Sequence, residues 1–233
     1  MPETFPLVKR RFKTAIQRIL SEHESLEIDE AALPAYAHRN PLIDYIFWKR
    51  VEIACGYART QGAKRVLDFG CGTGLTSYAL AQAGANVVAI DLNLAPLRLV
   101  QTQVTFPPTI RFIEGDLLKI DMEGGFDLIV ALDVLEHISD LSLYIERFAG
   151  LLNPGGSVIV SGPSENWLYR IGRKVAGQRF TGDYHVSNIR TIRTAFAQEM
   201  RTETIATLVW PLTLFEIFTA GLVESAAVEP ASP

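Results

Sequence analysis

The middle of the chain alternates between two patterns of apolar residues. One is a short, largely apolar run of the length of a buried strand, and such runs lie at 65–69, 86–90, 109–113, 126–132 and 157–161. The other has apolar residues at helical spacing and lies between these runs, at 74–83, 94–104 and 139–152. Strands that alternate with helices predict a parallel sheet with helices on both faces and right-handed crossovers. The sequence therefore predicts a doubly wound α/β fold.

The most apolar stretch of the chain lies near its carboxyl end. Residues 205–222 are long enough for a membrane helix. However, Pro211 and Glu216 interrupt the stretch, and β-branched and aromatic residues dominate it. We therefore expect two buried strands joined at Pro211, at 203–210 and 213–220, and keep a membrane helix as the weaker alternative.

The first two strands end in residues that are typical of a nucleoside site. The first runs into three glycines at every second position, Gly70, Gly72 and Gly74, and the second ends in Asp91. Glycines let the backbone turn tightly and approach a ligand, and an acid at the carboxyl end of the second strand can hold ribose hydroxyls. This pattern predicts that an adenosine-type ligand binds in the crevice at the carboxyl edge of the sheet.

The glycine spacing and a nearby acid distinguish between two kinds of adenosine ligand. The dinucleotide fingerprint needs a glycine three residues after its second glycine, where this chain has Leu75 or Ser77. Asp68 lies two residues before Gly70, and a carboxylate there would repel a pyrophosphate and attract an ammonium or sulfonium group. These residues favour a cationic, phosphate-free nucleoside such as S-adenosylmethionine over a nicotinamide cofactor.

The same residues resemble motif I of the class I S-adenosylmethionine-dependent methyltransferases. Three later segments also resemble that family: EGDL at 114–117, FDLIVALDVLEH at 126–137 and LLNPGG at 151–156. The resemblance is close over about 60–162 and looser elsewhere. It implies a Rossmann-like, seven-stranded sheet in the order 3-2-1-4-5-7-6, with an antiparallel last strand and additional N-terminal helices.

The resemblance also implies a set of cofactor-binding residues. Asp91 would take the ribose hydroxyls, Asp116 the adenine amino group, and Leu117 would offer its backbone N–H to the ring. Leu132 and Asp133 would border the methionine part of the cofactor. The complete expected set is Asp68, Gly70, Cys71, Gly72, Gly74, Asp91, Leu92, Asp116, Leu117, Leu132 and Asp133. Two of these acids have structural alternatives: Asp91 as a helix cap and Asp116 as a solvated turn acid.

Three residues are candidates for moving a proton during catalysis. Tyr184 and His185 follow the fifth strand, on the side of the sheet where an acceptor must lie. His137 belongs to the Glu-His dipeptide at the end of the fourth-strand segment. A histidine titrates near neutrality and can take a proton from an acceptor hydroxyl. Each histidine also has a structural alternative: His137 would fix the helix that follows it, and His185 would be a loop or packing residue.

The composition of the chain argues against two kinds of partner, nucleic acid and metal ions. The 233 residues carry 22 basic and 26 acidic side chains, for a net charge of −4, so nucleic acid is an unlikely partner. Two cysteines and four scattered histidines do not suggest a metal site. Cys71 lies inside the glycine turn, where a disulfide to Cys55 would disrupt the backbone, which favours a reduced, cytoplasmic setting.

Two segments suggest an amphipathic acceptor. Basic residues flank the apolar stripe of the first N-terminal helix, and the segment 167–180 mixes basic and aromatic residues in the same way. We therefore expect a small-molecule or amphipathic, anionic acceptor and peripheral contact with a membrane surface. The alternative is that each stripe packs on the core.

The chain is expected to form one catalytic domain with additions. Helices at about 5–21 and 42–59 place an N-terminal lid at 1–58, followed by the methyltransferase domain at 59–228 and a flexible tail at 229–233. The domain would carry an acceptor-side insertion at about 163–200. The expected function is methyl transfer from S-adenosylmethionine to an unidentified acceptor. The alternatives are an inactive nucleoside-binding subunit on the same fold and a nicotinamide oxidoreductase.

Overall fold

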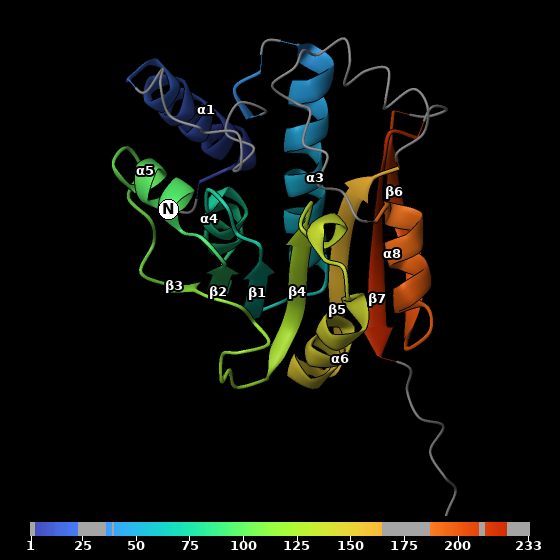
Figure 1. Cartoon of the computed structure of the whole chain (residues 1–233). Coiled ribbons are helices and arrows are strands. Elements are labelled where there is room, and N and C mark those ends of the chain that lie inside the picture. The colour runs from blue at the N-terminus through green and yellow to red at the C-terminus, as the bar shows by residue number, and fades with distance from the viewer. Residues whose placement is uncertain (1–2, 23–35, 39, 165–186, 210–212, 223–233) are drawn as a thin grey trace, which may run out of the picture.

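A computed structural model describes residues 3–22, 36–38, 40–164, 187–209 and 213–222 (Figure 1). Its helices are α1 (Phe5–Glu22), α3 (Pro41–Thr60), α4 (Leu75–Gln82), α5 (Ala95–Gln101), α6 (Leu141–Leu151) and α8 (Ile189–Phe196), with a 3-10 turn, η2 (Leu135–His137). Its strands are β1 (Arg65–Phe69), β2 (Asn86–Asp91), β3 (Ile110–Glu114), β4 (Phe126–Leu132), β5 (Leu152–Pro163), β6 (Met200–Leu208) and β7 (Phe215–Leu222).

The seven strands form one mixed sheet in the order β3-β2-β1-β4-β5-β7-β6. Strands β1 to β5 pair in parallel, and β7 runs antiparallel to both of its neighbours, β5 and β6. The expected Rossmann-like strand order and the antiparallel last strand are therefore confirmed. Because β1, β2 and β4 are parallel neighbours, their carboxyl ends meet at one edge of the sheet.

The period of two along each strand divides the core into two clusters, one on each face of the sheet. On β1, Val66 belongs to the cluster under α1, α3, α4 and α5, while Leu67 belongs to the cluster under α6 and α8. Both side chains have no exposed surface. Helices cover both faces, as the alternation of elements predicts.

The N-terminal helices pack on this core. Asn40 caps α3 by accepting a hydrogen bond from Leu42 N, and α3 then runs to Thr60, past the expected domain boundary at residue 58. Phe12 of α1 is fully buried, with its ring 5.1 Å from that of Tyr78 on α4. Helix α1 therefore lies docked against α4 and α5 through its apolar stripe.

Within the segment 205–222, residues 205–208 belong to β6 and residues 215–222 to β7, as expected from its composition. The expected joint at Pro211 lies outside the described residues. Among the described residues, no helix combines the length and apolarity needed to cross a bilayer. Part of the expected insertion also has regular structure, since α8 begins after its cap Asn188 and buries Ile189, Ile192 and Phe196 against the sheet. The rest of that insertion, at 165–186, lies outside the described residues.

Candidate functional site

The glycine turn is held at the carboxyl ends of β1 and β2. The N–H groups of Gly70 and Cys71 both donate to Ile90 O of β2, at 2.9 and 3.2 Å. Gly70, Gly72 and Gly74 have φ values of 74°, 50° and 76°. Side chains disfavour this left-handed region, so the alternating glycines let the chain turn from β1 into α4.

The three glycines differ in what surrounds them. A Cβ on Gly70 would lie 2.5 Å from Val134 Cγ2, and one on Gly74 would lie 2.7 Å from Leu97 Cδ1 and 2.8 Å from Phe106 Cε1. A Cβ on Gly72 would have no atom within 4 Å. The outer glycines therefore allow close packing within the protein, and Gly72 presents bare backbone at the open side of the turn.

Asp91 connects the end of β2 to this turn. Its Oδ2 accepts a hydrogen bond from Gly72 N at 2.8 Å, and its Oδ1 accepts one from Asn93 N at 3.2 Å. The next residue, Leu92, has 72% of its surface exposed, which is unusual for a leucine beside a buried strand. An acceptor-rich carboxylate and an apolar side chain thus lie together beside bare backbone, an arrangement that suits a ribose and a flat base.

Asp68 lies underneath the turn rather than at its surface. Its side chain is 2% exposed and accepts a hydrogen bond from the Ser77 hydroxyl of α4. Burial raises the pKa of Asp68 to about 7, because the charged form loses its hydration. In this structure Asp68 therefore ties α4 to β1, and any attraction to a bound cation would act from beneath the turn.

Asp116 closes the turn after β3. Its Oδ1 accepts hydrogen bonds from Leu118 N and from the Tyr144 hydroxyl, both at 3.0 Å. These bonds, with the Leu118 N–H first, hold the pKa of Asp116 below its usual value, and burial together with the carboxylate raises the pKa of Tyr144 to about 12. Leu117 has no exposed surface. Asp116 therefore caps this turn, and its contact with an adenine remains a prediction.

Asp133 follows β4 in a left-handed conformation, with φ 52°. Its backbone N–H donates to Ser161 O at 3.1 Å, and its carboxylate accepts from the Ser161 hydroxyl at 2.9 Å. The same carboxylate forms an ion pair with Arg50 of α3. Leu132, the preceding residue, is half-buried against the core beneath α3 and α4. Three polar contacts therefore hold Asp133 at the carboxyl end of β4.

Arg50 and Ser161 are both residues of this site that the sequence analysis missed, and Arg50 is the charged one. It is 2% exposed, and its guanidinium carbon lies 4.1 Å from the ring centre of Phe47 and 5.7 Å from that of Phe215. A sequence signal existed, because Arg50, Ala54 and Ala58 lie on one face of α3 at intervals of four residues. A charged residue on a buried face requires a partner. The sequence could not show that this partner is Asp133.

The structure describes one of the three proton-transfer candidates, His137. His137 ends η2 with an exposed side chain, and its backbone N–H donates to Val134 O at 3.2 Å. Tyr184 and His185 lie outside the described residues. Cys55 and Cys71 are both free and buried; burial raises the pKa of Cys55 to about 12 and raises that of Cys71 as well, so neither is a reactive thiolate. Within the described residues, no cluster of three metal-ligating side chains occurs.

Curated proteins are similar in sequence to part of this chain. The ubiquinone biosynthesis O-methyltransferase of Pseudomonas aeruginosa (strain UCBPP-PA14) is 41% identical over 106 residues, which are 44% of this chain and 46% of that protein. The protein of the same name from Psychrobacter arcticus is 33% identical over 141 residues, which are 54% of each protein. The chain thus spans about half the length of these curated relatives.

Solved structures match most of the chain. The N-methyltransferase NodS from Bradyrhizobium japonicum WM9, in complex with S-adenosyl-L-homocysteine, has a TM-score of 0.61 at 16% identity and matches 92% of this chain and all of that chain. The magnesium protoporphyrin IX methyltransferase ChlM from Synechocystis PCC 6803, with the same molecule bound, has a TM-score of 0.58 at 21% identity, over 92% of this chain and 98% of that one. At these identities the likeness shows a common fold.

A family model matches more of the chain than these two curated relatives do. The model described as "Methyltransferase domain" covers residues 11–206, which is more than half of the chain. It begins within α1 and ends within β6, so it includes α3, the glycine turn, Asp91 and Asp133. The chain belongs to the methyltransferase-domain family.

Proposed function

We propose that this chain transfers the methyl group of S-adenosylmethionine to a hydroxyl oxygen of a small-molecule or lipid-like acceptor. The observation that carries the proposal is the edge formed by Gly72 and Asp91, where a carboxylate lies 2.8 Å from the bare backbone of the glycine turn. The curated relatives named as ubiquinone biosynthesis O-methyltransferases support transfer to oxygen.

The residues at the crevice fit this cofactor. Asp91 offers two acceptor oxygens to the ribose hydroxyls, exposed Leu92 offers an apolar surface to the base, and open space beside Gly72 admits the ligand close to the backbone. When bound, the cofactor supplies a methyl group that its sulfonium already activates. The protein's task is then to align the acceptor oxygen with that methyl and to exclude water.

The acceptor side is formed by the ends of β4 and β5. Asp133 projects from this edge, and Arg50 and Ser161 fix its carboxylate. His137 follows on η2, and the chain continues from β5 toward Tyr184 and His185. His137, Tyr184 or His185 would serve as the base that takes the hydroxyl proton during transfer. A lipid-like acceptor would be met at a membrane surface, with the enzyme otherwise in the cytoplasm.

Helices α1 and α3 would act as a lid over the crevice. Arg50 of α3 reaches the crevice edge at Asp133, so ordering of the edge is coupled to the position of α3. Ligand binding would tighten this contact and reduce water access during transfer.

A product assay tests the proposal. The full chain is incubated with S-adenosylmethionine and a metabolite extract, and S-adenosylhomocysteine is measured together with extract masses that increase by about fourteen daltons, the mass of the methylene gained when a methyl group replaces the hydroxyl proton. The expected result is S-adenosylhomocysteine that forms only when the extract is present, and at least tenfold less of it with the Asp91→Ala variant at a limiting concentration of S-adenosylmethionine. Binding of S-adenosylhomocysteine without any product under these conditions would instead indicate an inactive binding subunit.

A further inference from the structure

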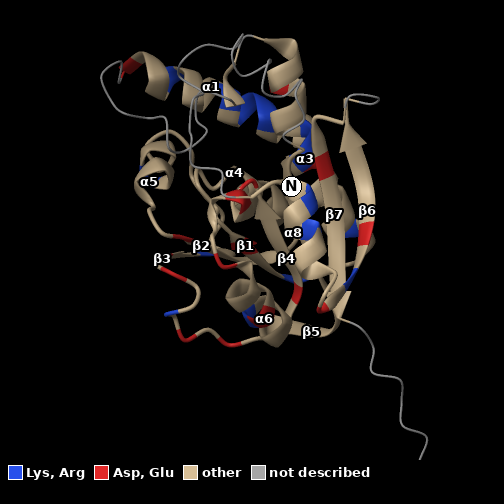
Figure 2. Cartoon of the chain, turned by 45° about the vertical axis from the view of Figure 1, so that its right-hand side comes forward, with Lys and Arg blue, Asp and Glu red and all other residues tan. Residues whose placement is uncertain are grey.

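Helix α1 has two basic faces with different surroundings. On one face, Lys9 and Lys13 both pair with Asp44 of α3, at 2.8 and 2.6 Å. The Lys9 ammonium also lies 5.3 Å from the ring centre of Trp48. These contacts join α1 to α3, so the two lysines have a structural role. Figure 2 shows the basic residues of α1 in the upper part of the molecule.

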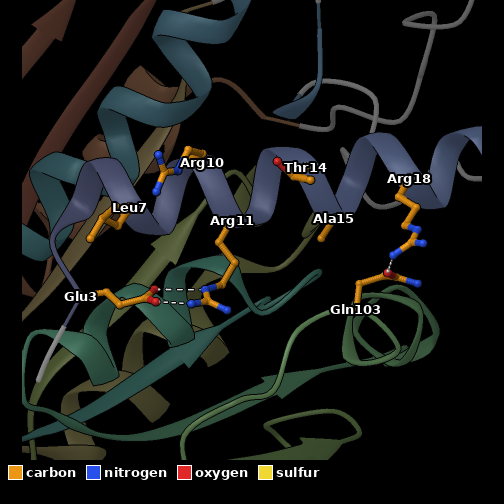
Figure 3. A pocket seen from close by; sticks show the side chains of 8 residues that line it. All are labelled: Glu3, Leu7, Arg10, Arg11, Thr14, Ala15, Arg18 and Gln103. Atoms are coloured by element: carbon orange, nitrogen blue, oxygen red, sulfur yellow. Dashed lines mark hydrogen bonds and ion pairs between the residues drawn. The ribbon is translucent and has the colours of Figure 1, made fainter.

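The second face carries arginines that line a cavity. Arg10, Arg11 and Arg18 border a volume of about 420 Å³ between α1 and Gln103, which follows α5. We call this cavity the arginine groove; its remaining lining residues are Glu3, Leu7, Thr14 and Ala15. Figure 3 shows Arg11 and Arg18 reaching from α1 toward Glu3 and Gln103. The groove has three cations and one carboxylate, in a chain whose net charge is −4.

The arginines of the groove are only partly neutralised. Arg11 donates hydrogen bonds to the Glu3 carboxylate through both Nε and Nη2. A carboxylate of the protein itself therefore already neutralises this guanidinium. Arg18 makes longer contacts, 3.4 Å to Gln103 Oε1 and 3.3 Å to Glu22. Within the described part of the chain, no hydrogen bond or ion pair involves the exposed Arg10 side chain. The groove therefore has an excess of forked donors over acceptors.

We propose that the arginine groove binds a multiply charged phosphate group, such as a diphosphate. Guanidinium forks match the oxygens of phosphate in pairs, and the Thr14 hydroxyl can add a neutral donor. Glu3 competes for Arg11 as an internal carboxylate. Leu7, which is 42% exposed, gives one end of the groove an apolar rim. This site is separate from the glycine turn and Asp91, so it extends beyond the methyl-transfer proposal.

Calorimetry with inorganic pyrophosphate on the full chain tests the site. Replacing two arginines in the variant Arg10→Gln/Arg18→Gln should weaken binding at least tenfold, because charge-assisted bonds to phosphate are lost. Glu3→Gln should tighten binding several-fold, since it removes the competing carboxylate. Arg201→Gln, a single charge removal at an exposed position on β6, is the control and should leave affinity unchanged. Thermal unfolding verifies that each variant is folded.

A second arm identifies the source of the phosphate. Co-sedimentation compares phosphatidylglycerol and phosphatidylcholine vesicles at low and high salt, because contacts between exposed charges are screened by salt. Arginine-dependent binding to the anionic vesicles assigns the groove to lipid headgroups; pyrophosphate binding without vesicle binding assigns it to soluble phosphates. The proposal is overturned if neither probe binds, or if the double variant binds as well as Arg201→Gln. Unchanged affinity in Glu3→Gln overturns the competition by Glu3.

Discussion

Asp91 acts at the scale of a single residue, where one carboxylate serves both the turn and the proposed ligand. Replacing Asp91 with alanine removes two acceptor oxygens, and each charge-assisted hydrogen bond contributes about 1.5–3 kcal/mol. We therefore expect Asp91→Ala to weaken S-adenosylhomocysteine binding at least tenfold in titration calorimetry.

Two further variants separate ligand contact from turn geometry. Asp91→Asn keeps an oxygen that can accept from Gly72 N but loses the charge, so its affinity should fall between those of wild type and Asp91→Ala. Asp121→Ala removes an exposed acid between β3 and β4 and should have no effect. If Asp91→Ala bound S-adenosylhomocysteine with nearly unchanged affinity, the proposed cofactor site at Asp91 and the glycine turn would be wrong.

Asp68 predicts an unusual pH dependence of stability. Its pKa is raised to about 7 in the folded protein from an ordinary value of 3.8. Between these values the folded state binds more protons than the unfolded state, so stability decreases as the pH rises through this window. From pH 5 to pH 8 this one group would lower the free energy of unfolding by about 2–3 kcal/mol.

The Asp68→Asn variant isolates that contribution. Asparagine keeps an oxygen for the Ser77 hydroxyl and does not titrate, so the variant should lose less stability than wild type between pH 5 and pH 8. Urea unfolding at both pH values measures the difference. Equal pH dependence in the two proteins would mean that Asp68 remains charged when buried.

At the scale of an element, helix α1 packs against the residues that support the glycine turn. The Phe12 ring lies 6.0 Å from that of Phe106, and Phe106 fills the space against which Gly74 packs. Phe12→Ala should lower the free energy of unfolding by about 3–5 kcal/mol and weaken S-adenosylhomocysteine binding several-fold. Leu7→Ala, at an exposed site on the same helix, should change stability by less than about 0.5 kcal/mol. Loss of stability without loss of affinity would limit α1 to a packing role.

The lid proposal belongs to the same scale. If α1 and α3 close over the crevice, amide hydrogen exchange in Phe5–Glu22 and Pro41–Thr60 should slow when S-adenosylhomocysteine is added. Exchange in β6, far along the sheet order from β1, provides the internal reference. Equal exchange in α1 and α3 with and without ligand would reject the lid.

Periodic elements were predictable from the sequence, and elements that depend on distant partners were not. The apolar runs located β1, β2 and β4 to within one residue. In contrast, β5 begins at Leu152 rather than at the predicted residue 157. The prediction began too late because Asn153, Pro154 and the two glycines that follow are typical of a turn. The short helix α8 was missed, although Asn188 and the spacing of Ile189, Ile192 and Phe196 are helix signals.

Part of the candidate site was likewise predictable from the sequence and part was not. The glycine turn and Asp91 were predictable because a local spacing defines them, and the two lie together at the carboxyl ends of β1 and β2. Their contact with a cofactor stays a prediction. The pair of Arg50 and Asp133 joins residues that are far apart in the chain, and its partner choice depends on how α3 crosses the end of β4. Spacing along a sequence contains no such information, whereas burial in the folded chain does.

At the scale of the whole molecule, cofactor binding should raise the thermal stability of the protein. A ligand that binds only the folded state stabilises it by about 2.7 kcal/mol at one hundred times its Kd. For a chain of this length, that should raise the Tm by about 5–10 °C. We expect S-adenosylhomocysteine to produce this shift in wild type and a much smaller one in Asp91→Ala. The same concentration of NAD should leave the Tm unchanged, because the glycine spacing does not match the dinucleotide fingerprint. A larger shift with NAD than with S-adenosylhomocysteine would reverse the cofactor assignment and favour the oxidoreductase.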